Sequence, residues 1–118
     1  MLEIDPAITL TIDVASLEGT RRRVTVAGEL DLVTAAELQS RLDAELTDGR
    51  DVELDLSGVA FVDSTGLGVL VHTAQRAQAA GTGFVIHEPL PSQMRRVLRV
   101  TGLDRRLPTA PAPDSPAP

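Results

Sequence analysis

The sequence VAFVDSTGLG, residues 59–68, joins an apolar extended segment directly to an apolar-periodic helix. Residues 59–62 are uniformly apolar and predict a buried segment, and the apolar positions within 67–74 follow the spacing of one helical face. Ser64 and Thr65 are therefore predicted to lie at a helix N-terminus. In α/β proteins, functional groups gather at such junctions between a strand and a helix.

The polar residues of this motif have two interpretations. Asp63 or Ser64 caps the helix by accepting a hydrogen bond from a free backbone N–H. Alternatively, Ser64 is a functional hydroxyl, and Gly66 and Gly68 remove side chains so that a phosphate or a protein surface can approach it.

A second predicted helix start, near Thr34, favours the functional interpretation. Thr34 and Glu37 have the spacing of a capping box, and Val33 and Leu38 have that of a hydrophobic staple. The motif helix lacks an acidic partner at the corresponding position, and each of its two glycines costs about 1 kcal/mol of helix stability relative to alanine. We infer that stability alone does not explain the motif.

Composition limits the protein to a small set of classes. The 118 residues suit one domain, and the absence of cysteine excludes disulfides, thiolate metal sites and a cysteine nucleophile. No apolar run approaches the roughly 20 residues that span a bilayer, and the first residues lack the pattern of a signal peptide. These features predict a cytoplasmic protein with no membrane association.

The charge of the chain argues against nucleic acid as a partner. The net charge is -6, whereas phosphate backbones are bound by basic surfaces. Phe61 and Phe84 are the only aromatic residues, which excludes base-stacking platforms and aromatic-lined flavin or sugar sites. Arginines cluster at 21–23 and within 95–106. We interpret the first cluster as charges that keep a strand edge soluble, and the second as charges that complement the dipole at a helix C-terminus.

The first part of the chain is predicted to form a hairpin and a helix. Residues 8–14 and 23–28 alternate in polarity and are joined by a turn near 18–19. A helical stripe then runs over 35–46 and ends at the Asp-Gly pair of 48–49.

The rest of the chain alternates between strands and helices. A strand is predicted at 52–56, and the sequence leaves open whether 59–62 adds another. The motif helix ends at Gly81, a strand follows at 84–86, and Ser92 is predicted to cap a last helix. The order β-β-α-β-α-β-α predicts an α/β fold, with a mixed sheet of four to five strands covered by helices.

Residues 1–107 are expected to form this domain. The Pro/Ala-rich residues 108–118 have no large side chain to bury, so they are expected to form a disordered tail with a polyproline bias.

The motif lacks the partners for catalysis within the chain. Ser64 is not in a Gly-x-Ser-x-Gly elbow, and His72 and His87 are interpreted as ordinary surface or loop histidines. An aspartic-protease motif needs a small residue directly after Ser64, whereas Gly66 comes one position later. A P-loop would need a Gly-Lys-Ser/Thr ending, which this motif lacks. A flavodoxin-like phosphate cradle is the remaining non-regulatory alternative, although the chain has no Trp or Tyr to sandwich a flavin. We predict no enzyme activity, no cofactor and no metal site.

Five sequence blocks together resemble the STAS domain of bacterial anti-sigma factor antagonists. They cover roughly residues 8–107 in the order of that family, and they read GELD (28–31), DLSGV (55–59), FVDSTGLG (61–68), RVL (96–98) and TGL (101–103). The resemblance implies a STAS-like fold and a cytoplasmic switch in partner-switching signalling, monomeric or weakly dimeric.

The resemblance also implies roles for individual residues. The serine after the motif aspartate is the phosphoacceptor of that family, which corresponds to Ser64 here. An anti-sigma factor serine kinase is expected to phosphorylate it, and a PP2C-type serine phosphatase to remove the phosphate. The unphosphorylated protein is expected to bind the anti-sigma factor and free a sigma factor. The expected partner-binding set is Asp31, Asp63, Ser64, Thr65, Gly66 and Gly68.

One alternative keeps the fold and changes the role. A STAS domain can serve as a scaffold or accessory subunit of a signalling or lipid-transport complex, with Ser64 unmodified.

Overall fold

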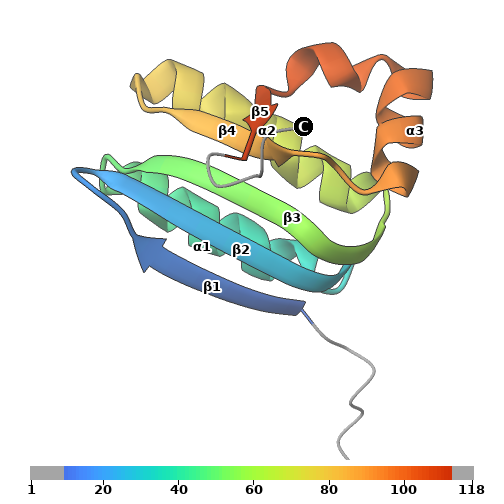
Figure 1. Cartoon of the computed structure of the whole chain (residues 1–118), viewed down its shortest axis with the longest axis horizontal. Coiled ribbons are helices and arrows are strands. Elements are labelled where there is room, and N and C mark those ends of the chain that lie inside the picture. The colour runs from blue at the N-terminus through green and yellow to red at the C-terminus, as the bar shows by residue number, and fades with distance from the viewer. Residues whose placement is uncertain (1–9, 113–118) are drawn as a thin grey trace, which may run out of the picture.

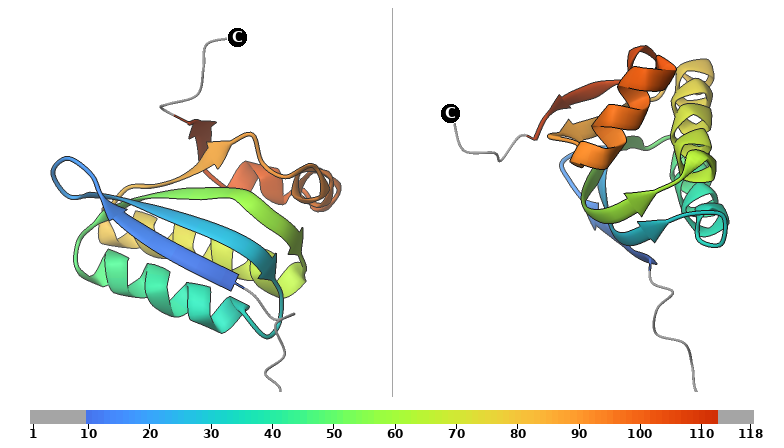
Figure 2. Two further views of the ribbon diagram at one scale, coloured as in Figure 1. Left: turned by 60° about the horizontal axis from the view of Figure 1, so that its bottom comes forward. Right: turned by 90° about the vertical axis from the view of Figure 1, so that its right-hand side faces the viewer.

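The computed structural model describes residues 10–112, which form a mixed α/β fold. The sheet is five-stranded with order β1-β2-β3-β4-β5; β1 is antiparallel to β2, and the other neighbours are parallel. The edges of the sheet are β1 and β5 (Figure 2). The elements are β1 (Leu10–Ser16), β2 (Arg21–Leu30), α1 (Ala35–Thr47), β3 (Asp51–Val62), α2 (Ser64–Ala80), β4 (Phe84–Glu88), α3 (Ser92–Thr101), the 3-10 helix η1 (Leu103–Arg106) and β5 (Thr109–Pro111).

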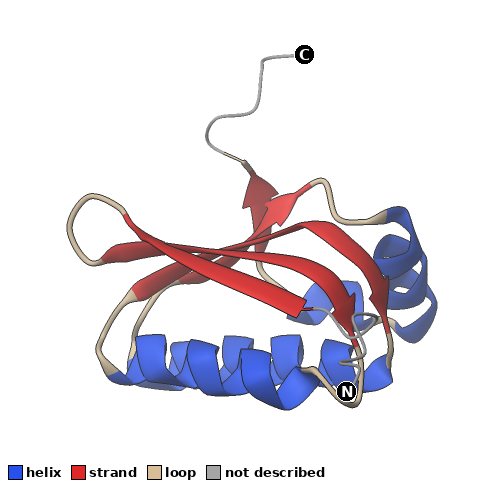
Figure 3. Cartoon of the chain, turned by 90° about the horizontal axis from the view of Figure 1, so that it is seen from below, coloured by secondary structure: helices blue, strands red, loops and turns tan. Residues whose placement is uncertain are grey.

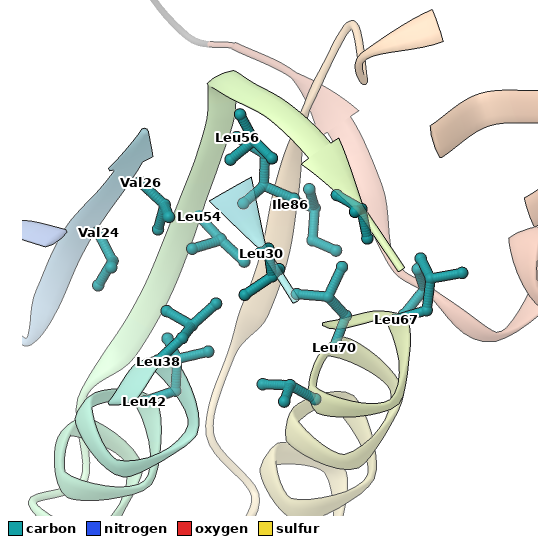
Figure 4. Packing of buried hydrophobic residues seen from close by; sticks show 14 of the residues in the cluster. Val24, Val26, Leu30, Leu38, Leu42, Leu54, Leu56, Leu67, Leu70 and Ile86 are labelled. Carbon is teal, nitrogen blue, oxygen red and sulfur yellow. The ribbon is translucent and has the colours of Figure 1, made fainter. Parts of the chain in front are cut away.

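The core lies between the sheet and the two long helices. Helices α1 and α2 lie side by side against one face of the sheet (Figures 1 and 3). Leucines of both helices meet alternate residues of the central strands, because every second side chain of a strand points to the same face (Figure 4). The predicted stripe of α1 is confirmed, since Ala35, Leu38, Leu42 and Leu46 are all buried.

A bulge lets β3 continue into the motif without a break. Between the pairs Thr25–Asp55 and Ala27–Gly58, β3 contains one residue more than β2. A Cβ atom on Gly58 would lie 2.9 Å from Cβ of Ala27, which leaves no room for a side chain there. The open question about residues 59–62 is thus resolved, because they belong to β3. Their predicted uniform burial is wrong, since Phe61 is 42% exposed.

The end of the fold differs from the sequence prediction. The predicted tail of 108–118 begins too early, because β5 pairs in parallel with β4, and the Ile86 amide donates to the Pro108 carbonyl at 2.8 Å. Proline has no N–H to donate, so a proline-rich segment fits an edge strand that accepts more than it donates. Residues 113–118 lie outside the described part of the chain.

The opposite face of the sheet carries paired charges. Glu53 of β3 contacts Arg21 and Arg23 of β2, the latter at 3.6 Å, and its Oε1 lies 3.1 Å from Nε2 of His87. Burial alone would raise the pKa of Glu53, but the hydrogen bonds from Arg21 and His87 outweigh it and the pKa lies below its ordinary value. The prediction that His87 is a surface or loop residue is wrong, because it lies in β4 and is 6% exposed.

Asp51 joins three segments at the edge where the parallel strands begin, far along β3 from the motif. Its Oδ1 accepts a hydrogen bond from the Gly83 amide at 2.7 Å, and its Oδ2 accepts one from the Thr20 hydroxyl at 2.8 Å. The bond from Gly83, followed by that from Thr20, lowers the pKa of Asp51 below its ordinary value, against a smaller opposing effect of burial.

Asp51→Asn should therefore lower the free energy of unfolding by an amount that depends on pH. A carboxylate whose pKa is lowered by folding stabilises the protein fully above its unfolded pKa of about 4, and this contribution is lost as the pH falls through the folded pKa. In urea unfolding, the gap between wild type and Asp51→Asn should be constant from neutral pH to about pH 5 and shrink below about pH 4. Asp48→Asn, at the exposed C-cap of α1, is the control and should change little. A gap that widened on acidification would contradict this account.

Candidate functional site

The motif lies at the carboxyl ends of two neighbouring parallel strands. Leu30 ends β2 and Val62 ends β3, and these two residues are paired. Asp31 and Asp63 therefore leave the sheet side by side, at the edge where α/β proteins place their binding sites. The fold thus brings Asp31 to the motif.

Asp63 links the segments at this edge through both of its carboxylate oxygens. Its Oδ1 accepts a hydrogen bond from the Gly66 amide at 3.0 Å and so caps α2. Its Oδ2 accepts one from the Leu32 amide at 3.2 Å, and its own amide donates to the Leu30 carbonyl at 3.1 Å. Asp63 is consequently both a helix cap and a link to the loop between β2 and α1.

The predicted capping box at Thr34 is wrong. The Thr34 side chain makes no cap hydrogen bond; its hydroxyl donates to the Glu29 carbonyl at 2.7 Å and accepts from the Asp31 amide at 3.0 Å. Asp31 Oδ1 organises the turn instead, by accepting from the amides of Val33 and Thr34 at 3.0 and 3.1 Å. Val33 is 68% exposed, so the predicted staple is also wrong. The two helix starts are thus the reverse of what the sequence predicts, because the motif helix α2 has a side-chain cap and α1 has none.

The two glycines of the motif have different roles. A Cβ atom on Gly66 would lie 2.7 Å from Cγ and 2.9 Å from the carbonyl oxygen of Leu30, so Gly66 is required by internal packing. Leu30 is itself buried beside Leu70 of α2 (Figure 4). A Cβ atom on Gly68 would meet nothing within 4 Å. Only Gly68 therefore fits the predicted role of keeping an exposed surface clear.

Ser64 and Thr65 are exposed at the first turn of α2. Within residues 10–112, the Ser64 hydroxyl makes no hydrogen bond to another group of the chain. The neighbouring cap is supplied by Asp63, so the Ser64 side chain is not needed to hold the helix start. Its oxygen is free to meet another molecule at the positive end of a helix dipole.

Exposed apolar side chains lie next to the motif, and their exposure was not predicted from the sequence. Leu32 is 74% exposed and Val33 is 68% exposed, in the loop that Asp63 holds. Large apolar side chains that remain exposed together mark interaction surfaces. The sequence signal was the apolar pair at 32–33, which precedes the first buried position of the helical stripe.

The histidines lie in ion-pairing positions. His72 Nε2 on α2 is 3.8 Å from Asp43 Oδ1 on α1, and His87 contacts Glu53. Among the described residues, no three His, Asp or Glu side chains gather as a metal site. None of the helices in that part of the chain combines the length and apolar character needed to cross a bilayer.

Comparisons with known proteins converge on one family. The family model described as "Mlab, STAS domain" matches residues 10–109. An anti-sigma-B factor antagonist of Bacillus subtilis is 33% identical over 96 residues, covering 81% of this chain and 86% of the relative. The crystal structure of an anti-sigma factor antagonist from Mycobacterium paratuberculosis is 33% identical with a TM-score of 0.73, covering 93% and 92% of the two chains. The Bacillus cell fate determinant SpoIIAA in its phosphorylated form shares the fold, with a TM-score of 0.66 at 18% identity, covering 85% and 91%.

Alanine substitutions at the two glycines should have opposite effects on stability. Gly66→Ala forces Cβ into Leu30 and should lower the free energy of unfolding by about 1–3 kcal/mol. Gly68→Ala adds a methyl group in open space on a helix and should raise it by about 0.5–1 kcal/mol. Denaturant unfolding of both variants tests this. If the two substitutions destabilised the protein equally, the assignment of Gly66 to packing and Gly68 to the surface would be wrong.

Proposed function

The chain belongs to the STAS domain family of anti-sigma factor antagonists, and on that basis we propose that it is a phosphorylation-controlled member of it. Members of this family are regulatory binding proteins rather than enzymes. In the proposed cycle, the unphosphorylated chain binds an anti-sigma factor kinase and thereby releases a sigma factor. Phosphate on Ser64 ends that binding, and a PP2C-type phosphatase restores it.

The observation that carries this proposal is the state of the Ser64 hydroxyl. It is exposed, it lies at the N-terminus of α2, and no described group of the chain binds it. A kinase could therefore reach it without opening the fold. The kinase would supply ATP and magnesium, so this chain needs no catalytic residue of its own.

The same geometry lets the domain tolerate the phosphate. Phosphorylation would break no hydrogen bond within the described chain, because the cap of α2 is made by Asp63. The helix dipole favours an anion at this position. The switch would then act on the interface and leave the fold intact.

Electrostatics explains why the phosphate would end binding. It adds about -1.5 to -2 charge at neutral pH, next to the carboxylates of Asp63 and Asp31. Leu32 and Val33 form the apolar part of the same surface, and a partner that covers them would also have to remove water from the phosphate. Thr65 and Gly68 are expected to contact the partner directly, whereas Gly66 acts through packing.

We expect the cognate kinase to add one phosphoryl group to the full chain, on Ser64. The chain would be incubated with ATP and the anti-sigma factor kinase encoded nearest to it, and intact-mass spectrometry would count the phosphates. Ser64→Ala should abolish the modification, whereas Ser40→Ala, which removes an exposed hydroxyl of α1 outside the motif, should keep it. Phosphate that persisted in Ser64→Ala would refute the assignment, and no phosphate on wild type would favour the scaffold alternative.

Ser64→Asp should fold normally and bind the kinase at least about tenfold more weakly, a loss of about 1.4 kcal/mol. The added carboxylate places like charge beside Asp63 and Asp31. Calorimetric titration measures the affinity, thermal unfolding checks the fold, and Ser64→Asn provides a control of similar size without the charge. Equal affinities for the Asp and Asn variants would show that charge does not drive the switch.

A further inference from the structure

Helix α3 and the following η1 form a concentrated basic segment on an acidic protein. Residues 92–106 contain five of the eleven basic residues and one of the seventeen acidic residues. This segment therefore carries a charge of +4, while the rest of the chain carries -10. The five arginines, which we call the α3–η1 arginines, are all exposed: Arg95, Arg96, Arg99, Arg105 and Arg106.

These arginines have no partners within the described range, a feature that they share with the isolated Arg41 and Arg50 but combine with clustering. Arg21 pairs with Glu53, and Arg76 lies 3.1 Å from Asp43. The side chains of the α3–η1 arginines make no hydrogen bond or ion pair with any residue in the described range. Their charge is therefore available to another molecule.

Helix stability does not explain their positions in α3. Arg95 and Arg99 are four residues apart, where two like charges on a helix repel each other. Arg95 and Arg96 lie in the N-terminal half of α3, near the positive end of its dipole, and only Arg99 lies in the last turn. Within α3, therefore, only Arg99 is placed to complement the helix dipole, as the sequence predicts for this cluster.

The arginines of α3 surround a groove with an apolar component. Its volume is about 450 Å³, and Leu90 and Leu98 contribute apolar walls. Val100, further along the same helix, is 79% exposed. The lining is completed by Ser92, Arg95, Arg96, Arg99 and Asp104.

We propose that Arg95, Arg96 and Arg99, the arginines that line this groove, form a second docking surface, which binds an acidic segment of a protein partner. Carboxylates on such a segment would pair with the guanidinium groups, and its apolar side chains would enter the groove beside Leu90 and Leu98. A nucleic acid or an anionic membrane would extend beyond this small surface and meet the -10 charge of the remaining chain. A short acidic segment avoids that repulsion.

This surface adjoins the motif through Gln93. The Gln93 side chain, in the first turn of α3, accepts from the Val62 amide at 3.3 Å and donates to the Val62 carbonyl at 3.4 Å. Val62 lies two residues before Ser64, and α3 lies at the end of the sheet beside the turn from β3 into α2 (Figure 1). A partner seated on the motif could therefore present an acidic segment to α3, although binding at α3 needs no phosphate on Ser64.

The test is a fluorescence anisotropy titration of the full chain against a short labelled peptide of Glu, Asp and Leu. Wild type should bind, and Arg95→Gln/Arg96→Gln/Arg99→Gln should bind about tenfold more weakly or worse, because three exposed charge pairs are lost. The control is Arg22→Gln/Arg41→Gln/Arg50→Gln, which removes the same charge elsewhere and should stay within about twofold of wild type. Thermal unfolding would confirm that both triple variants are folded.

Several outcomes would overturn the proposal. Equal losses in the two triple variants would show that net charge, and not this surface, attracts the peptide. Tighter binding of wild type to a DNA duplex or to phosphatidylserine vesicles than to the peptide would assign a different class of partner. The absence of peptide binding at low salt, where exposed charges interact most strongly, would show that the surface does not dock acidic segments.

Discussion

Two hydrogen bonds accepted by the Asp63 carboxylate hold the elements together at the carboxyl edge of the sheet. One oxygen caps α2 through Gly66, and the other holds the loop between β2 and α1 through Leu32. Because the two bonds reach different elements, the positions of Ser64 and of the exposed Leu32 are set by one side chain. Gly66 completes this arrangement, since its missing side chain lets α2 begin directly against Leu30.

Periodicity was sufficient to predict the architecture, and local hydrogen bonding limited the prediction of the site. The alternation of apolar residues predicted the hairpin, the helical face of α1 and the mixed sheet, because burial of one face is a property of many residues together. The start of α1 was predicted wrongly, because Thr34 and Asp31 compete for the same turn and sequence spacing does not show which side chain wins. Strand β5 was not predicted for a related reason. It pairs with β4 through backbone groups, and the side chains of a Pro/Ala-rich segment carry no pattern that indicates this pairing.

The site separates residues that build the surface from residues that lie open on it. The side chains of Asp63 and Asp31 make hydrogen bonds within the chain, and the missing side chain of Gly66 allows close packing against Leu30. Ser64 and Gly68 make no such contact among the described residues. A family motif read from sequence contains both kinds of residue, so its positions cannot all be assigned to binding.

The charged face of the sheet restricts how this domain can be joined to others. Arg21, Glu53 and His87 satisfy one another in place of a covering helix layer. Stacking a second sheet or helix there would strip water from the Arg21 guanidinium, whose side chain is 44% exposed, and removing a charge from water costs several kcal/mol. Larger assemblies of this domain should therefore grow from its helices and strand edges, and leave this face in contact with solvent.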